Sequence, residues 1–342
     1  MRMIANAAAL VALSLIAAPG ASADSVAEFY KGRNVTIIAA TGAGSGYGLQ
    51  GRVLAAHLKK YIPGNPNVIM QFMPGGGGVK MLNYLYNAAP KDGTYIGFPL
   101  KFIAINTMLG RKGLKYDSSK FGYLGGIGPI DGVIAVWKAT SPAITLAGMR
   151  TKQVIMGSTG KSSGTYITPT MMNNVLGTKF KVVTGYKGMA PIEFAMEAGE
   201  VHGRSGSWDA IKAGRSHWLE GDKKVAVVAQ TGLARNPDLQ DVPTLVELAK
   251  GAEDKSIIRF FANADAIGWF FVIPPDVPEE RFAALREALA KTAKDPAYVA
   301  AAKAKKITIV PTSGERIEQL VKDTLATSPA LMAKIKRAMG AK

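Results

Sequence analysis

The amino-acid sequence predicts an α/β protein of two lobes with a ligand cleft between them. Short apolar, β-branched runs alternate with segments whose apolar residues recur at helical spacing, and glycine-rich turns join strand to helix. The same alternation begins again at Val133, which indicates a second unit. Short turns of this kind imply parallel strands covered by helices. We expect the ligand to bind where the carboxyl ends of the strands meet helix N-termini.

The first group of elements opens with a buried strand over residues 35–40, because this run is apolar and β-branched. A helical stripe from Leu49 to Tyr61 follows, and Pro63-Gly64 ends it. The remaining predictions of this group are a strand at 67–72, a glycine-rich turn at 74–78, a helix through 79–86 and a strand at 94–98.

The second group and the C-terminal third repeat the theme. We predict strands at 133–137, 153–156, 180–184, 225–229 and 269–273, and helices at 163–176, at 191–198 and from Pro278. Proline suits the first turn of that last helix. We expect residues 24–128 and 230–342 to form a discontinuous first lobe, and residues 129–229 to form the second.

Composition narrows the function classes. The 342 residues include 42 Lys and Arg against 25 Asp and Glu, three His and no Cys, which gives a formal charge of +17. Without Cys there is no disulfide, thiolate metal site or Cys nucleophile. The charge favours anionic partners, but the basic residues come as scattered pairs such as Lys59-Lys60, so we do not expect nucleic acid as a partner.

The N-terminus predicts export. Arg2 precedes an apolar run over residues 4–18, and Ala21-Ser22-Ala23 has the small-x-small pattern of a signal-peptidase site. We therefore expect residues 1–23 to be a signal peptide that is cleaved after Ala23, leaving a soluble exported protein. A membrane anchor is the alternative, although the run is shorter than the about 20 residues that span a bilayer.

The first glycine-rich loop, residues 41–48, lies between a predicted strand and a predicted helix. It fails the dinucleotide fingerprint, because the third glycine would fall on Tyr47 or Leu49. A glycine-rich turn at a helix N-terminus still brings backbone N–H groups to an anion. The alternative is a tight turn that needs glycine for its backbone angles alone.

A second loop, residues 157–162, ends in the Gly-Lys-Ser of a nucleotide-binding loop, but Ile155 occupies the position where such a loop requires its first glycine. Its hydroxyls can cradle a carboxylate, and ordinary helix capping by Ser162 or Ser163 is the alternative. Two further candidates follow strands. Residues 185–188 offer a Tyr and a Lys that can bind a carboxylate, and a plain turn is the alternative. Residues 204–208 offer small side chains and an indole for a pocket wall, although Trp208 suits a core equally well.

Catalysis finds little support in the sequence. There is no Gly-x-Ser-x-Gly elbow, and His57, His202 and His217 lack metal-ligand spacing. We expect no enzyme, no metal and no cofactor.

Several short motifs together resemble the substrate-binding proteins of tripartite tricarboxylate transporters, also called the Bug family. The resemblance covers nearly all of the chain after residue 23. The motifs are Gly44-Ser45-Gly46-Tyr47, Ile62-Pro63-Gly64-Asn65-Pro66, Met73-Pro74-Gly75-Gly76-Gly77-Gly78, Ala89-Pro90-Lys91-Asp92-Gly93-Thr94, Gly185-Tyr186, Ala198-Gly199-Glu200-Val201, Asp241-Val242-Pro243-Thr244 and Ile273-Pro274-Pro275-Asp276-Val277-Pro278.

The resemblance implies a type II periplasmic-binding-protein fold whose cleft closes on a small di-, tri- or aromatic carboxylate. It also implies a periplasmic location and delivery of the ligand to a membrane transporter. We expect the receptor to be a monomer. The alternatives are a sensor for a two-component receptor and a secreted hydrolase. The ligand-binding residues we expect are Thr41, Gly42, Ala43, Gly44, Ser45, Gly46, Tyr47, Ser158, Thr159, Gly160, Ser162, Ser163, Thr165, Gly185, Tyr186, Lys187, Gly188 and Trp208.

The chain departs from the family pattern at two acidic positions. Relatives commonly carry Asp where this chain has Gly48 and His202. A buried ammonium needs an acidic partner, so we expect a purely anionic ligand without an amino group.

Overall fold

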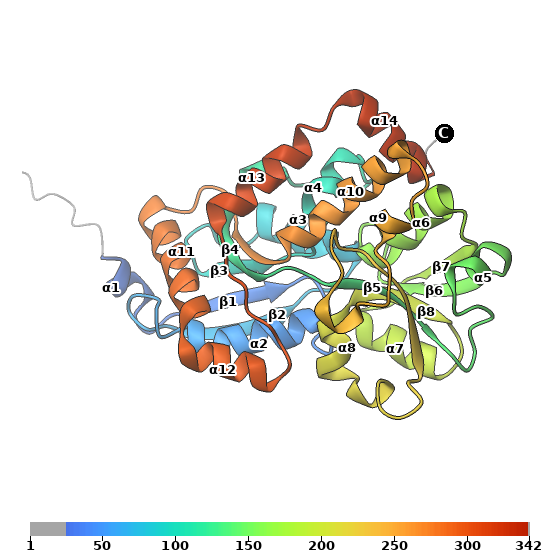
Figure 1. Ribbon diagram of the computed structural model, residues 1–342. Helices are drawn as coiled ribbons and strands as arrows, with labels where there is room; N and C mark the ends of the chain where they lie inside the picture. The colour runs from blue at the N-terminus through green and yellow to red at the C-terminus, as the bar shows by residue number, and fades with distance from the viewer. Residues whose placement is uncertain (1–24, 341–342) are drawn as a thin grey trace, which may run out of the picture.

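A computed structural model describes residues 25–340, so the predicted signal peptide lies outside the described residues. The chain forms two β-sheets, each covered by helices on both faces (Figure 1). This confirms the predicted α/β fold with two lobes. Within the described range, no helix is long and apolar enough to cross a membrane.

The first sheet has the strand order β11-β4-β10-β3-β1-β2. Strands β1, β2 and β3 are parallel, as the glycine-rich turns predict, whereas β10 runs antiparallel to β3 and β4. Its strands are β1 (Asn34–Ala39), β2 (Asn67–Phe72), β3 (Tyr95–Phe98), β4 (Gly122–Gly128), β10 (Trp269–Ile273) and β11 (Thr312–Ser313). The helices packed around it are α1 (Val26–Tyr30), α2 (Gly46–Leu58), α3 (Val79–Asn87), α4 (Ile103–Met108), α11 (Glu279–Lys294), α12 (Pro296–Ala304) and α13 (Gly314–Leu325).

The second sheet has the order β7-β6-β8-β5-β9, with β6 parallel to β7 and β8, and β5 antiparallel to β8 and β9. Its strands are β5 (Gly132–Trp137), β6 (Val154–Ser158), β7 (Phe180–Thr184), β8 (Gly203–Ser207) and β9 (Val225–Gln230). The helices on this side are α5 (Leu146–Thr151), α6 (Gly164–Leu176), α7 (Met189–Glu197), α8 (Trp208–Gly214), α9 (Leu245–Leu248), α10 (Ala252–Ile267) and α14 (Pro329–Ala338).

Strand β10 shows why continuous apolar runs become central strands. All five of its residues are buried, and they alternate between two cores. Trp269, Phe271 and Ile273 pack with α2, α11 and α12, whereas Phe270 and Val272 pack with α3, α4 and α13. A run that is apolar at every position therefore satisfies both faces of the sheet.

Three strands were not predicted: β11, which has only two residues, and β4 and β8, which are rich in glycine. Their glycines allow close packing: a Cβ on Gly122 would lie 2.6 Å from Ile273 Cγ1, and one on Gly203 would lie 2.6 Å from the Ala135 carbonyl oxygen. Glycine usually weakens a strand, and here it marks positions where a neighbour approaches the backbone.

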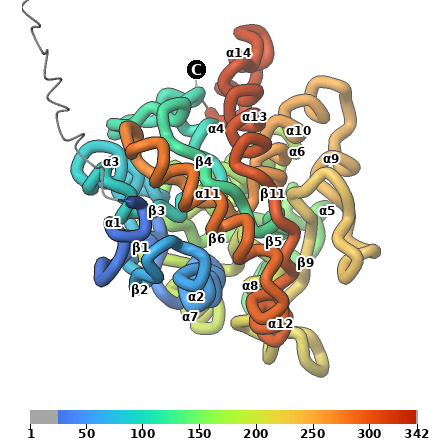
Figure 2. Tube along the Cα trace, turned by 90° about the vertical axis from the view of Figure 1, so that its left-hand side faces the viewer, coloured from blue at the N-terminus to red at the C-terminus, as the bar shows by residue number. Residues whose placement is uncertain are grey.

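The two sheets are joined by short crossovers. Residues 129–131 connect β4 of the first sheet directly to β5 of the second. The C-terminal helices also link the two sides, because α13 contacts α4 while α14 contacts α6 (Figure 2). A cavity lies beside these crossovers, between the sheets.

Candidate functional site

The cavity between the sheets opens to solvent, and its empty space, open solvent included, amounts to about 740 Å³. Elements of both sides contribute to it: the loops after β1, β3 and β6, the N-termini of α2, α6 and α7, strand β8 and Trp269 of β10. The lining residues are Thr41, Ser45, Gly46, Tyr47, Leu100, Lys101, Phe102, Ile130, Gly132, Thr159, Ser163, Gly164, Thr165, Thr168, Met189, Arg204, Ser205, Gly206, Ser207, Ala210 and Trp269.

The first glycine-rich loop supplies one wall. Thr41 and Ser45 hydroxyls are 2.7 Å apart, Ser45 donates to the Gly42 carbonyl, and Ser45 also accepts from the Gly48 N–H as the N-cap of α2. The first N–H groups of a helix have no intrahelical acceptor, so those of Gly46 and Tyr47 are open to a ligand. The Tyr47 ring packs edge-on against Trp269, 4.6 Å between centroids.

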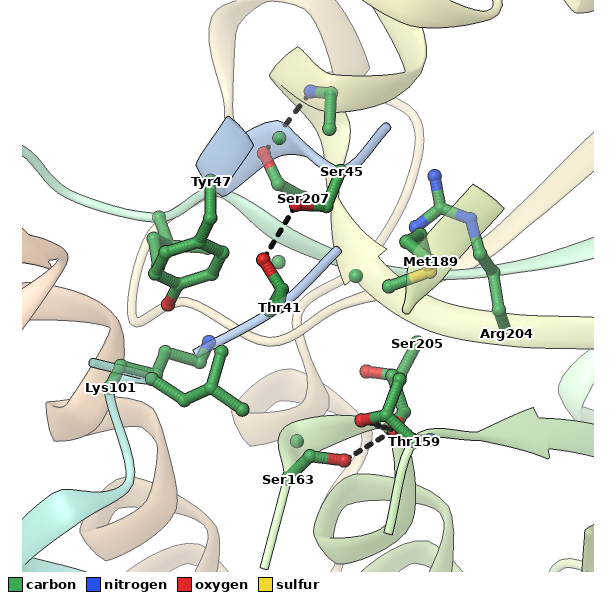
Figure 3. Close-up of a pocket in the computed structure, with 18 of the residues that line it drawn as sticks. Thr41, Ser45, Tyr47, Lys101, Thr159, Ser163, Met189, Arg204, Ser205 and Ser207 are labelled. Carbon is green, nitrogen blue, oxygen red and sulfur yellow. Dashed lines mark hydrogen bonds between the residues drawn. The ribbon is translucent and has the colours of Figure 1, made fainter. Parts of the chain in front are cut away.

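The second loop supplies the opposite wall, and Thr165 is its centre. The Thr165 hydroxyl lies within hydrogen-bond distance of the Ser158 and Ser163 hydroxyls, and it accepts from the Thr159 N–H at 3.0 Å. Figure 3 shows Thr41 on one side of the cavity and Thr159 and Ser163 on the other. Because α6 begins at Gly164, its first N–H groups also face this space.

The two lobes touch through glycine backbones beside the cavity. A Cβ on Gly42 would lie 3.1 Å from the Lys187 carbonyl oxygen, and a Cβ on Gly160 would lie 2.6 Å from the Gly77 nitrogen. A separate small pocket beside this contact is lined by Tyr186, Lys187 and Gly188 together with Thr41 and Thr159. The first three of these residues do not line the main cavity.

The remaining predicted residues lie away from the main cavity wall. Gly44 packs against Ala190 of α7, and the Ala43 carbonyl accepts from Arg52. Ser158 is fully buried behind Thr165, and the Ser162 carbonyl accepts from Asn106. Gly185 has open space around it.

Trp208 belongs to the apolar core of the second sheet, as the alternative interpretation allowed. It packs with Ile211 and Trp218, and its indole N–H donates to Asp238. Its neighbours Arg204, Ser205, Gly206 and Ser207 line the cavity instead.

Sequence reasoning missed Lys101, the cationic side chain that enters the cavity from the loop after β3. Its side chain is 13% exposed and forms an ion pair with Asp265 of α10, whose other oxygen accepts from Thr231. Burial lowers the pKa of Lys101, and the nearby Asp131 carboxylate opposes that shift. Its position just past the carboxyl end of a parallel strand is the signal that could have identified it.

Arg204 of β8 is the second charge at the cavity, and it is completely buried. Its Nη2 lies 2.9 Å from Glu193 Oε1, while Arg215 approaches the other Glu193 oxygen at 3.0 Å. Arg204 Nε and Nη1 are buried without a hydrogen-bond partner in the described part of the chain. Nη1 occupies the place where a Cβ of Gly206 would be, beside Met189 (Figure 3).

The two positions that depart from the family pattern have separate structural roles. Gly48 leaves no space for a side chain, because a Cβ there would lie 2.1 Å from the Ala43 carbonyl oxygen. His202 accepts the Ile155 N–H through Nδ1 at 3.0 Å, and burial lowers its pKa. His202 therefore binds the backbone of β6 and does not line the cavity.

The arrangement as a whole suits an anion. Hydroxyl groups and the N-termini of α2 and α6 converge from opposite lobes on one cavity, and each helix end favours negative charge.

Comparison with known proteins identifies relatives of this arrangement. A family model described as "Tripartite tricarboxylate transporter family receptor" matches residues 51–337. Among solved structures, the periplasmic binding protein BugD is 18% identical, with a TM-score of 0.71 over 90% of this chain and 98% of that one. No curated protein matches the chain.

Two further structures have the same fold. R. palustris Rpa4515, solved with adipate, is 20% identical, with a TM-score of 0.70 over 90% of this chain and 97% of its own. MatC (Rpa3494) from Rhodopseudomonas palustris, with bound malate, is 17% identical, with a TM-score of 0.70 over 89% and 99%.

Proposed function

The chain belongs to the receptor family of tripartite tricarboxylate transporters, and on that premise we propose that it captures a small carboxylate between its lobes and delivers it to a membrane transporter. The observation that carries this proposal is the convergence of hydroxyls and two helix N-termini, one from each lobe, on a single cavity. Adipate and malate in two structures of the same fold support a carboxylate as the ligand class.

The proposed contacts follow from the donors on each wall. Thr41, Ser45 and the N–H groups of Gly46 and Tyr47 would bind carboxylate oxygens from the first lobe. Thr159, Ser163 and Thr165 would do so from the second. A ligand that bridges both sets binds the closed arrangement more tightly than an open one, and it shifts the population toward closure by that difference.

The remaining parts of the proposal come from the sequence. Export by a signal peptide cleaved after Ala23 would place the receptor in the periplasm as a monomer. The lobe boundaries at residues 129 and 230 are part of the same proposal. Closure would then occur around the crossovers beside the cavity.

A thermal-shift screen tests the proposal directly. Mature protein, stripped of co-purified ligand, is heated with di-, tri- and aromatic carboxylates. A ligand at one hundred times its Kd adds about 2.7 kcal/mol to the free energy of unfolding, which raises the melting temperature by about 4 °C at this size. A screen in which no carboxylate raises the melting temperature contradicts the proposed function.

Two variants test whether a ligand that raises the melting temperature binds at this site. We expect Thr41→Val to weaken binding about tenfold or more, because a hydrogen bond to a charged group is lost. Thr36→Val is the matched control, since Thr36 is a buried threonine of β1 outside the cavity. Equal affinities for Thr41→Val, Thr36→Val and the unchanged protein would remove the site assignment.

A further inference from the structure

Arg204 of β8 belongs to a buried cluster that holds more positive than negative charge. Its side chain is completely buried, and its Nη2 lies 2.9 Å from Glu193 Oε1. Arg215 approaches the other oxygen of the same carboxylate at 3.0 Å. Two guanidinium groups thus share one carboxylate, which leaves one positive charge without a counter-charge. An uncompensated buried charge is costly, so the cluster favours the arrival of a further anion.

The hydrogen-bonding groups of Arg204 point in the same direction. Within residues 25–340, Arg204 Nε and Nη1 are buried and have no hydrogen-bond partner. A guanidinium carries five N–H donors, and a buried donor without an acceptor destabilises the protein. An acidic group of a ligand would supply both the missing acceptor and the missing negative charge.

Arg204 is within reach of the main cavity, and Met189 covers it. Both residues line the cavity together with Gly206. A Cβ on Gly206 would lie 2.1 Å from Arg204 Nη1 and 2.9 Å from Met189 Cε, so these two atoms are neighbours, and glycine leaves the space that they need. Figure 3 shows the Met189 side chain beside the guanidinium. Met189 is only half-buried, and an unbranched side chain with three rotatable bonds can move aside and open Nη1 to a ligand.

Lys101, the other cation of the cavity wall, has a carboxylate of its own. It forms an ion pair with Asp265, whose second oxygen accepts from Thr231. Figure 3 shows Lys101 on one side of the cavity and Arg204 on the other. A pair of one cation and one anion leaves less charge for a ligand than two cations on one anion, so the surplus lies on the Arg204 side.

The charged side chains behind these walls leave that surplus in place. Burial lowers the pKa of Arg204, and Glu193 and Arg215 are the charged groups that act on it. A second charged cluster is centred on one lysine, and none of its members lines the cavity. The members of this cluster are Lys212, Asp209, Asp238 and Asp131.

The loops on the two lobes have enough donors of their own to hold a first carboxylate. The N-termini of α2 and α6 face the cavity, and hydroxyls from both loops line it. Strand β8 adds neutral donors to the wall that Arg204 occupies, because Ser205 and Ser207 also line the cavity. Ser207 accepts the Ala210 N–H, so its own hydroxyl proton is available to a ligand.

From the charge surplus and the unpartnered N–H groups we propose that Arg204 is a second anchor for the ligand. The loops at the N-termini of α2 and α6 hold one carboxylate, and Arg204 Nη1 binds a second acidic group of the same molecule after Met189 moves aside. The inference rests on the proposed function and deepens it: the ligand is a dicarboxylate, and Arg204 selects it over a monocarboxylate with the same body.

Matched ligand pairs measured by calorimetry on the unmodified protein test the second anchor. Succinate is compared with butyrate, glutarate with pentanoate, adipate with hexanoate and terephthalate with 4-methylbenzoate, because in each pair one carboxylate takes the place of a methyl group. We expect the diacid to bind about tenfold more tightly in the pair whose length fits both anchors, since a hydrogen bond to a charged group is gained. Equal or weaker binding of the diacid in every pair overturns the inference while leaving the proposed function intact. Absence of binding by every acid of the set rejects the proposed function instead.

Arg204→Met removes the anchor at similar side-chain length. Glu193 keeps Arg215 as its partner, so the variant leaves no buried carboxylate unpaired. We expect the preferred diacid to lose about tenfold in affinity and its matched monoacid to keep its own. Arg286→Met is the control, because Arg286 is paired with Glu315 and does not line the cavity, and it should leave the affinity ratio of diacid to monoacid unchanged. Equal losses for the two acids, or no loss for either, would overturn the role of Arg204 as a second anchor.

Met189→Ala tests the cover and decides the question if Arg204→Met does not fold. The affinity ratio of diacid to monoacid should rise about threefold, because the diacid no longer has to displace the contacts of a thioether. Met70→Ala is the control, since Met70 is a half-buried methionine of β2 outside the cavity. A ratio in Met189→Ala equal to that in Met70→Ala overturns the inference.

Discussion

Gly77 of the first lobe lies against the backbone of Ser163 of the second, so closely that a Cβ on Gly77 would be 2.6 Å from the Ser163 nitrogen. Gly160 makes the reciprocal approach to the Gly77 nitrogen at the same distance. The lobes therefore meet backbone to backbone at the edge of the ligand cavity, and only glycine permits this contact.

We expect Gly77→Ala to weaken ligand binding, because its methyl group would keep the lobes from reaching this contact. Small-angle X-ray scattering with saturating ligand should show a larger radius of gyration than for the unchanged protein. Gly32→Ala is the control: Gly32 has a similar backbone angle (φ +71°, against +67° for Gly77), and no atom lies within 4 Å of the place that its added methyl group would take. Affinity equal to that of Gly32→Ala would contradict this role of Gly77.

Thr165→Val should affect both stability and binding. The hydroxyl accepts from the Thr159 N–H and contacts Ser158 and Ser163, so its loss leaves buried polar groups without a partner, at about 1–3 kcal/mol. Urea unfolding and calorimetry measure the two effects. Thr292→Val removes a buried hydrogen bond to the Ala288 carbonyl far from the cavity, and it should lower stability alone. Unchanged ligand affinity in Thr165→Val would exclude its loop from the site.

Gly48→Ala should destabilise the first loop, because the added methyl would overlap the Ala43 carbonyl oxygen. We expect a loss of about 1–3 kcal/mol in the free energy of unfolding, typical of overpacking, together with weaker binding. Gly214→Ala, in α8 with nothing within 4 Å, should instead be neutral or slightly stabilising. Equal unfolding free energies for the two variants would show that the loop adapts without cost.

Asp295 should make stability depend on acid pH. Its carboxylate accepts from Lys60, from Tyr61 and from the Ala297 N–H, and these bonds lower its pKa to about 2. The unfolded value is about 3.9, so the stabilisation is present above pH 4 and is lost as pH falls toward 2. Urea unfolding at pH 5, 4 and 3 should show the advantage of the unchanged protein over Asp295→Asn shrinking. A difference that stays constant over this range would contradict the assignment.

Strands were predicted correctly where the local sequence is rich in residues that favour strands. The bounds of β2, β7 and β10 match the predicted ranges, because β-branched and aromatic residues favour strands. Of the three, only β10 is buried throughout, whereas β2 and β7 are largely exposed strands at the sheet edges. Strands β4 and β8 escaped prediction because their glycines suit turns equally well. The close approach of Ile273 to Gly122 explains that choice of residue only after the neighbouring strand is in place.

The hydroxyl loops were predictable for a related reason. Thr41, Ser45, Thr159 and Ser163 follow buried strands and open helices, a position that can be identified from local order alone. Lys101 and Arg204 gave no comparable signal. Their partners Asp265 and Glu193 are 164 and 11 residues away along the chain, and only packing reveals these ion pairs.

The sequence by itself determined the alternation of strands and helices, the glycine-rich loops and the family, because these depend on residue order and local conformational preference. The tertiary structure alone decided which residues face the cavity, that Trp208 packs in the core, and how the buried charges pair. Those features depend on distances between segments remote in the chain, which residue order and local conformational preference do not determine.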